Sequence, residues 1–164
     1  MPRLLELFAV PGSIGRAFRD LGWEVVSLDK CAKFAPTHLC DILQWDYAAA
    51  YPPGHFDVVW ASPDCTQYSC ARTKGPPRDL VGADRLVAKA LEIIDHFAPR
   101  WWRVENPATG LLKTRAVIRP LGVPYTISYC HYGFPFIAST PTSGATTHTL
   151  KRGPAARIAP TGTQ

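Results

Sequence analysis

The chain has 164 residues, 46% of them hydrophobic, which is enough for one domain with a buried core. Its apolar runs are far shorter than the roughly 20 residues that span a bilayer. Its five scattered cysteines do not form the pattern of a secreted disulfide scaffold. The formal net charge of +5 is compatible with nucleic-acid binding. We therefore expect a soluble, cytoplasmic protein without a membrane segment.

The opening segment has the pattern of a β-α-β unit. Leu4–Ala9 is an apolar run that predicts a strand, a turn with proline and glycine follows it, and Arg16–Leu21 has helical character. Glu24–Leu28 is a second, β-branched run that ends at Asp29. A connection of this kind makes the two strands parallel.

The rest of the chain continues this alternation. Gly82–Phe97 places apolar residues three and four apart, which predicts an amphipathic helix packed on a sheet. The other expected elements are strands near His38–Ile42 and at Phe56–Ala61, Trp101–Val104 and Tyr125–Tyr132, and a helix at Thr109–Val117. After Phe136 the sequence is rich in Thr, Pro, Gly and Ala without a clear period, which indicates loops.

Alternating strands and helices predict a single-domain α/β fold, with a mostly parallel open sheet and helices on both faces. We assign residues 1–136 to this domain and residues 137–164 to a basic tail that is loop-rich or partly disordered. From Val117 to Gln164 there is no Asp or Glu. This basic part of the chain is either a solvated tail or a segment that contacts phosphates.

Chemically interesting residues follow the predicted strands. Ligands of open α/β sheets bind beyond the carboxyl ends of the strands, and the sequence places Asp29, Asp41, Cys65 and Glu105 there. The turn after the first strand lets the backbone approach a ligand closely, although an ordinary tight turn has the same composition. Asp29 can accept hydrogen bonds from both hydroxyls of a ribose.

Two stretches contain candidates for covalent chemistry. Cys65 lies in the loop that follows a buried strand, close to a proline and among polar residues. This position favours a reactive nucleophile over a buried structural cysteine. Glu105 closes the next strand, where desolvation would raise its pKa and let it donate a proton. A surface glutamate that caps a helix is the alternative interpretation.

Three stretches together resemble the DNA (cytosine-5)-methyltransferase family, in particular short phage and bacterial members that lack a target-recognition domain. Leu7–Phe18 looks like the cofactor loop of the family, Ser62–Ser69 like its nucleophile motif, and Glu105–Pro107 like its Glu-Asn motif. Tyr132–Pro135 is similar to a later turn of phage-type members. The resemblance implies a class I, Rossmann-like methyltransferase domain over residues 1–136, in a bacterial cell or a phage-infected host.

The resemblance also implies roles for individual residues. Cys65 would add to carbon 6 of cytosine, Glu105 would bond the ring nitrogen and the exocyclic amine, and Asn106 would brace the Cys65 loop. Asp29 would hold the ribose of S-adenosylmethionine and Asp41 its adenine amino group. The full set expected to bind this cofactor is Phe8, Pro11, Gly12, Ser13, Ile14, Asp29, Lys30, Asp41, Ile42 and Pro63. DNA is the expected partner, and a partner chain is a candidate source of target recognition.

Some positions depart from the family pattern. Val10 stands where the family usually has its first glycine, and Asp64 stands where a second proline is common. A carboxylate beside Cys65 tends to raise the pKa of the thiol. The Gln-Xaa-Arg-Xaa-Arg motif of the family is not found near Tyr129–Tyr132, where His131 is the candidate substitute.

Other interpretations stay open at this point. A non-catalytic nucleic-acid or protein-binding module would keep the fold without the chemistry, and an enzyme of the same fold could act on a free nucleotide or use a modified cofactor. The spacing of Cys31, His38, Cys40 and Asp41 fits no usual zinc pattern and supplies no clear fourth ligand, so we expect no metal site. Cys70 is a second candidate thiol, although the motif favours Cys65.

Overall fold

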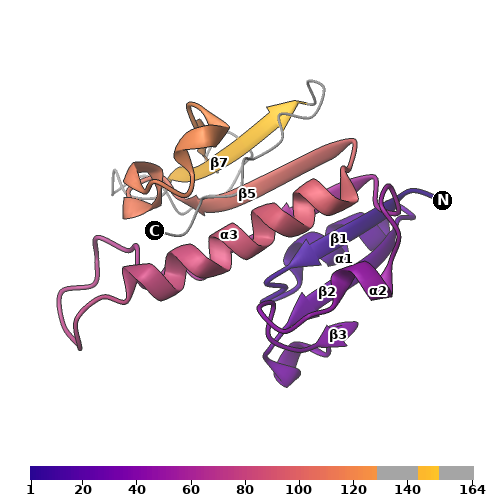
Figure 1. The fold of residues 1–164 in the computed structure, drawn as a ribbon, viewed down its shortest axis with the longest axis horizontal. Coiled ribbons are helices and arrows are strands. Elements are labelled where there is room, and N and C mark those ends of the chain that lie inside the picture. The colour runs from indigo at the N-terminus through magenta and orange to yellow at the C-terminus, as the bar shows by residue number, and fades with distance from the viewer. Residues whose placement is uncertain (129–143, 152–164) are drawn as a thin grey trace, which may run out of the picture.

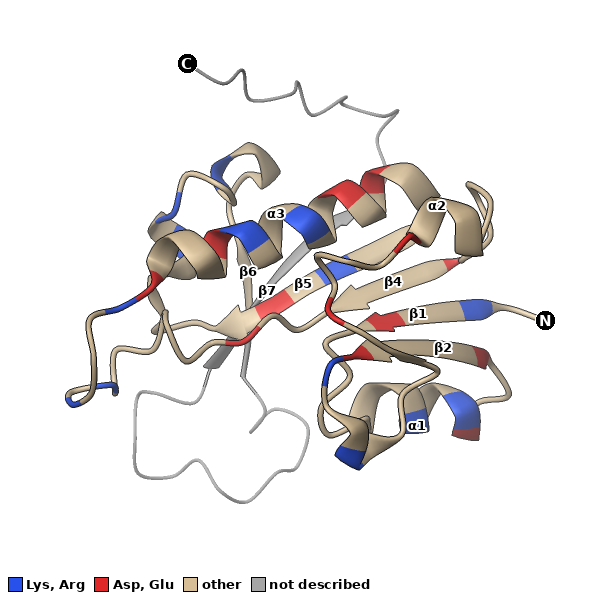
Figure 2. Cartoon of the chain, turned by 60° about the horizontal axis from the view of Figure 1, so that its bottom comes forward, with Lys and Arg blue, Asp and Glu red and all other residues tan. Residues whose placement is uncertain are grey.

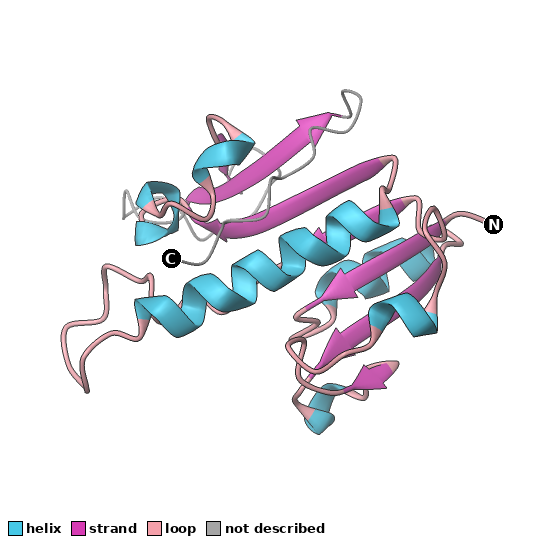
Figure 3. Ribbon diagram, viewed as in Figure 1, coloured by secondary structure: helices cyan, strands magenta, loops and turns pink. Residues whose placement is uncertain are grey.

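The computed structural model describes residues 1–128 and the backbone of residues 144–151. Within these residues the chain forms a seven-stranded sheet in the order β3-β2-β1-β4-β5-β7-β6 (Figures 1 and 3). The strands are β1 (Arg3–Leu7), β2 (Glu24–Asp29), β3 (His38–Leu39), β4 (Val58–Ala61), β5 (Trp101–Pro107), β6 (Tyr125–Ser128) and β7 (Gly144–Lys151). The helices are α1 (Ser13–Asp20), α2 (Tyr47–Ala50) and α3 (Leu80–Phe97), with 3₁₀ turns η1 (Ala32–Phe34), η2 (Leu111–Thr114) and η3 (Arg119–Leu121).

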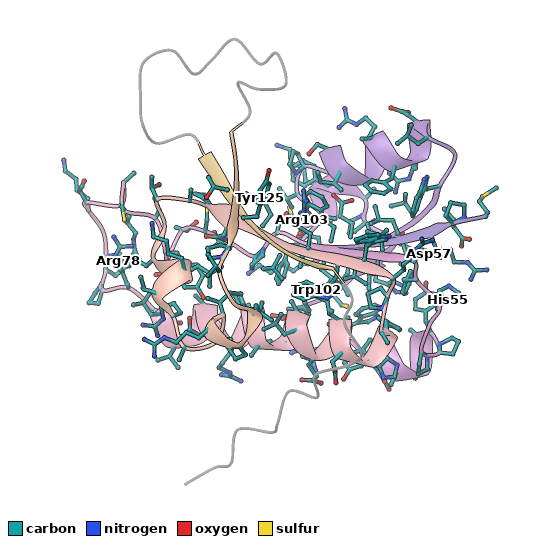
Figure 4. The ribbon with its side chains drawn as sticks, turned by 90° about the horizontal axis from the view of Figure 1, so that it is seen from above. His55, Asp57, Arg78, Trp102, Arg103 and Tyr125 are labelled. Atoms are coloured by element: carbon teal, nitrogen blue, oxygen red, sulfur yellow. The ribbon has the colours of Figure 1, made fainter. Side chains whose placement is uncertain are left out.

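The first five strands are parallel, and β7 and β6 are added antiparallel beside β5. Figure 4, seen along the edge of the sheet, shows α1 on one face and α2 and α3 on the other. This arrangement confirms the predicted α/β class, a mostly parallel open sheet with helices on both faces. No helix in the described part of the chain is long and apolar enough to cross a membrane.

The core lies between the sheet and α3. Leu5 and Leu7 of β1 are fully buried, and Val87 and Phe97 of α3 are equally inaccessible. Four consecutive residues of β1, Leu4 to Leu7, are buried, as expected for a parallel strand covered on both faces. The buried residues of α3 recur three and four apart, because one face of the helix lies on the sheet. The core therefore fixes α3 across the sheet, close to the loops that follow β4 and β5.

The predicted helix at Thr109–Val117 is wrong. The chain there forms the short 3₁₀ turn η2 instead, and η3 follows at Arg119–Leu121. The backbone bonds of this segment span three residues and not four, as in the Arg115 N–H to the Leu112 carbonyl (2.9 Å) and the Ile118 N–H to the Arg115 carbonyl (3.3 Å). Bonds of this length close short 3₁₀ turns, which do not extend into an α-helix here.

The other differences from the sequence prediction concern the last two strands, β6 and β7. The sequence predicts a strand at Tyr125–Tyr132; β6 covers its first four residues, and the remaining four lie outside the described residues. The expectation of loops after Phe136 is wrong for residues 144–151, because β7 pairs there with both β5 and β6. The division into a domain and a tail at residue 136 stays a prediction.

Candidate active site

The loop after β1 turns the chain directly into α1. Phe8 has a left-handed backbone (φ 61°), and Gly12 (φ 78°) stands before the first turn of α1. Glu6 is 4% exposed and accepts a hydrogen bond from the Gly15 N–H (3.1 Å). A side chain at Gly15 would collide with the Glu6 carboxylate. The hydrogen bond between Gly15 and Glu6 therefore holds α1 close to β1, at a distance that only glycine allows.

A cavity of about 420 Å³ opens beyond the carboxyl ends of β1, β2 and β4. Figure 2 shows acidic residues in red at the arrowhead ends of β1, β2 and β5. The cavity is lined by Phe8, Val10, Leu28, Asp29, Lys30, Cys31, Cys40, Asp41, Ile42, Ser62, Asp64 and Leu86. Its position is the one at which open α/β sheets bind their ligands.

Five of the ten residues expected at a cofactor site line this cavity, namely Phe8, Asp29, Lys30, Asp41 and Ile42. The other five do not line it. Pro11, Gly12, Ser13 and Ile14 form the entry into α1, and Pro63 is buried in the next loop. Pro11 and Ser13 are exposed at this helix entry.

Sequence reasoning missed seven of the lining residues. They are Val10, Leu28, Cys31, Cys40, Ser62, Asp64 and Leu86. Most of them adjoin a residue that was expected, so proximity along the chain was the available signal. Leu86 is the exception, because it reaches the cavity from α3 and only the packing of α3 on the sheet brings it there.

The Asp29 carboxylate is positioned by a backbone N–H two residues further along the chain. It is 8% exposed, and one carboxylate oxygen accepts the Cys31 N–H at 2.7 Å. The second oxygen makes no hydrogen bond within the described part of the chain and is available to a ligand in the cavity. Asp41 is arranged in the same way, with one oxygen accepting the Leu43 N–H at 2.9 Å. Both carboxylates are therefore preorganised acceptors.

The Cys65 turn follows β4. Cys65 is half-buried, and its carbonyl accepts the Tyr68 N–H (3.0 Å). Asp64 is exposed, and one of its oxygens accepts both the N–H (2.8 Å) and the hydroxyl (2.5 Å) of Thr66. Burial raises the pKa of the Cys65 thiol, and the negative charges of Asp64 and Glu105 raise it further. Cys65 is thus mainly a neutral thiol at neutral pH.

Glu105 lies beside this turn. Val104 pairs with Ala61 in the register of β4 and β5, which puts Glu105 next to the start of the Cys65 loop. Burial raises the pKa of Glu105, and a hydrogen bond with the Ser62 side chain partly offsets that rise. The parallel pairing of β4 and β5 places Cys65 and Glu105 beyond the carboxyl ends of two neighbouring strands. The arrangement combines a thiol with a carboxyl group whose acid form is favoured.

Asn106 connects the two loops. It is 2% exposed, and its amide nitrogen donates to the Pro63 carbonyl at 2.9 Å. Its amide oxygen is buried and has no hydrogen-bond partner among the described residues. Asn106 therefore holds the chain two residues before Cys65 against the end of β5. Within the same part of the chain, no group of three or more His, Cys, Asp or Glu is placed to hold a metal ion.

The influence of Asp64 on Cys65 gives a measurable pH effect. Asp64→Asn keeps an oxygen that can accept from Thr66 but removes the charge, so the pKa of Cys65 should fall. A lower pKa means more thiolate at every pH below it, and iodoacetamide should alkylate Cys65 roughly two- to fivefold faster at pH 7. Peptide mass spectrometry measures this rate. An unchanged rate, with the distant control Asp20→Asn also unchanged, would contradict the electrostatic account.

Comparison with known proteins agrees with this geometry. No family model matches the sequence. The chain is 34% identical over 142 residues to the "Probable DNA (cytosine-5)-methyltransferase" of Frog virus 3 (isolate Goorha). The predicted resemblance to the DNA (cytosine-5)-methyltransferases is confirmed. The match covers 79% of this chain and 64% of the viral protein, so the chain spans less than two thirds of the length of that relative.

The fold has a counterpart among solved structures. A "putative DNA modification methyltransferase" encoded within a prophage of E. coli superposes with a TM-score of 0.62 and 16% sequence identity. The superposition covers 90% of this chain and 45% of that chain. At this identity the likeness concerns the fold, and it confirms the expected Rossmann-like methyltransferase architecture.

Proposed function

We propose that this chain transfers the methyl group of S-adenosylmethionine to carbon 5 of cytosine in DNA, through a covalent adduct with Cys65. The observation that carries the proposal is the placement of Cys65 and Glu105 after the neighbouring strands β4 and β5, which the Asn106–Pro63 hydrogen bond joins, next to a preorganised cavity. The similarity to a DNA (cytosine-5)-methyltransferase supports the substrate, and the sequence order of the three motifs supports the roles of the residues.

The cavity suits S-adenosylmethionine. Its volume of about 420 Å³ lies in the range of small-molecule sites, which is roughly 300–1,000 Å³. The second oxygen of Asp29 would accept hydrogen bonds from the ribose hydroxyls, and Asp41 would accept a hydrogen bond from the adenine amino group. Leu28, Ile42 and Leu86 supply apolar surface for the purine ring. When bound, the cofactor supplies an electrophilic methyl group on a positively charged sulfur.

The residues of the chain carry out the remaining chemistry. The Cys65 thiol first loses its proton to solvent. The thiolate then forms a bond from Sγ to carbon 6 of cytosine, while the protonated Glu105 donates its proton to the ring nitrogen. The electron pair of the 5,6 double bond then makes carbon 5 nucleophilic enough to take the methyl group. A base removes the proton on carbon 5, the Sγ–carbon 6 bond breaks with release of the Cys65 thiolate, and the 5,6 double bond is restored. The ring nitrogen returns its proton to Glu105, which regenerates the acid. The target base must be flipped out of the duplex or single-stranded to reach Cys65.

The direct test is methyl transfer from S-[methyl-³H]adenosylmethionine to single-stranded DNA, double-stranded DNA and dCMP. We expect 5-methylcytosine in DNA, identified by mass spectrometry of the nucleosides. Product on dCMP alone would support an enzyme that acts on free nucleotides. Binding to DNA without transfer to any substrate would support a non-catalytic module. Target recognition by a partner chain also stays a proposal, and transfer by the purified chain to one defined site would contradict it.

Cofactor binding has its own test. Asp29→Ala removes the acceptor proposed for the ribose hydroxyls and should weaken S-adenosylmethionine binding by about 1.5–3 kcal/mol, the scale of hydrogen bonds to a charged group. Isothermal titration calorimetry measures the loss. Asp20→Ala, at the exposed end of α1, is the control and should bind as the unmodified chain does. Equal affinity of the two variants would rule out Asp29 as a cofactor ligand.

A further inference from the structure

A chain of polar side chains joins the Cys65 turn to two other segments. The Tyr68 hydroxyl donates to Asp84 Oδ1 at 2.9 Å. The Arg115 guanidinium donates to Asp84 Oδ2 through Nη2 (2.7 Å) and Nε (3.0 Å). Tyr68 belongs to the loop after β4, Asp84 to the first turns of α3, and Arg115 to the end of η2. The three residues therefore connect segments that are far apart in the sequence.

Tyr68 is held by hydrogen bonds of both its side chain and its backbone. It is fully buried, and burial together with the hydrogen bond to Asp84 raises the pKa of its hydroxyl, so it stays a donor. Its N–H donates to the Cys65 carbonyl (3.0 Å), and its own carbonyl accepts the Leu111 N–H (2.9 Å). The position of Tyr68 thus sets both the turn that contains Cys65 and the start of η2.

Asp84 and Arg115 form the outer part of this chain. Their side chains are 21% and 30% exposed, which is intermediate between the protein interior and the surface. A planar guanidinium that binds a carboxylate through two N–H groups is a geometrically defined pair. Losing Asp84 would also leave the buried Tyr68 hydroxyl without an acceptor, which is costly in an apolar setting.

We propose that Asp84 and Arg115 are positioning residues that hold Tyr68, and through it the Cys65 turn, against the strand that carries Glu105. This inference rests on the proposed function of Cys65 and Glu105. It adds two residues that touch neither the cavity nor the thiol. Asn106 holds the start of the turn through Pro63, and the Tyr68–Asp84–Arg115 chain holds its end.

The test measures the accessibility of Cys65, which needs no methyl transfer. We expect iodoacetamide to alkylate Cys65 at least about threefold faster in Tyr68→Phe, Asp84→Ala and Arg115→Gln, because the turn is released from its anchor. Arg115→Lys keeps the charge without the two-pronged contact and should lie between Arg115→Gln and the unmodified chain. The rate is followed on the Cys65 peptide by mass spectrometry.

Two controls separate positioning from general stability. Lys89→Gln breaks a surface ion pair with Glu92 on the same helix and should leave the Cys65 rate unchanged. Ile94→Ala weakens the core towards the other end of α3 and should not change the rate while the protein is folded, as checked by circular dichroism. Equal acceleration in Ile94→Ala and Asp84→Ala, or no acceleration in any of the three network variants, would overturn the proposal.

The second readout is kinetic. In the methyl-transfer assay, Asp84→Ala and Arg115→Gln should lower kcat at least about tenfold. KM for S-adenosylmethionine should stay within about twofold, since neither residue lines the cavity. Loss of cofactor affinity with unchanged kcat would overturn the positioning role. If the unmodified chain transfers no methyl group, the proposed function fails, and the alkylation rates still decide for or against the Tyr68 anchor.

Discussion

Cys65→Ser should abolish methyl transfer to DNA, with a rate at least about 10³-fold below that of the unmodified chain. A serine hydroxyl is a much weaker nucleophile at neutral pH and cannot form the adduct at carbon 6. The rate is measured as radioactive methyl groups incorporated into DNA. Cofactor binding by the same variant should be unchanged, because Cys65 does not line the cavity.

Cys70→Ser is the matched control for this result. Cys70 is exposed, and its thiol contacts the Thr109 carbonyl at 2.9 Å, which a serine hydroxyl can also do. Its methyl-transfer rate should stay within about threefold of the unmodified chain. Full activity of Cys65→Ser, or loss of activity in Cys70→Ser alone, would show that Cys65 is not the nucleophile.

Glu105→Gln should lower kcat by about 10²- to 10⁴-fold, the usual contribution of a general acid. An amide can still donate a hydrogen bond, but it cannot deliver a proton to the ring nitrogen. Burial raises the pKa of Glu105, so its acid form persists to a higher pH than that of an ordinary glutamate and is lost as the pH rises through that raised value. The contribution of Glu105 to kcat is therefore largest at the acidic end of the pH range.

A pH profile of kcat for the two proteins tests this assignment. The unmodified chain should lose the Glu105 contribution as pH rises, while the Glu105→Gln variant should be slow throughout and should lack that limb. Glu24→Gln, at an exposed position paired with Arg3, is the control and should keep the original profile. A Glu105→Gln variant with the original profile would show that another group donates the proton.

Much of the fold follows from local patterns in the sequence. The β-branched run at β2 and the three-and-four spacing along α3 were sufficient to place these elements, because their side-chain period matches their geometry. The strand β7 could not be predicted, since a Thr-rich segment becomes a strand through its pairing with β5. The helix α2 was also missed, as its four residues carry too short a pattern.

The candidate site shows the same division. Asp29 and Asp41 were found because they stand at strand ends, where the sheet topology alone brings ligands and side chains together. Leu86 and the Tyr68–Asp84–Arg115 chain depend on how α3 and η2 pack, which no local pattern contains. Asp64 was noticed only for its effect on the thiol, although it also lines the cavity.

A covalent trap measures most directly whether Cys65 bonds to carbon 6 of cytosine. DNA that contains 5-fluorocytosine blocks the final elimination, because fluorine cannot leave as the proton does. With S-adenosylmethionine present, we expect a denaturation-resistant protein–DNA complex, whose digestion yields the Cys65 peptide joined to the modified base. Failure to trap single- or double-stranded DNA, by a protein that binds the cofactor, would contradict a covalent cysteine mechanism in this chain.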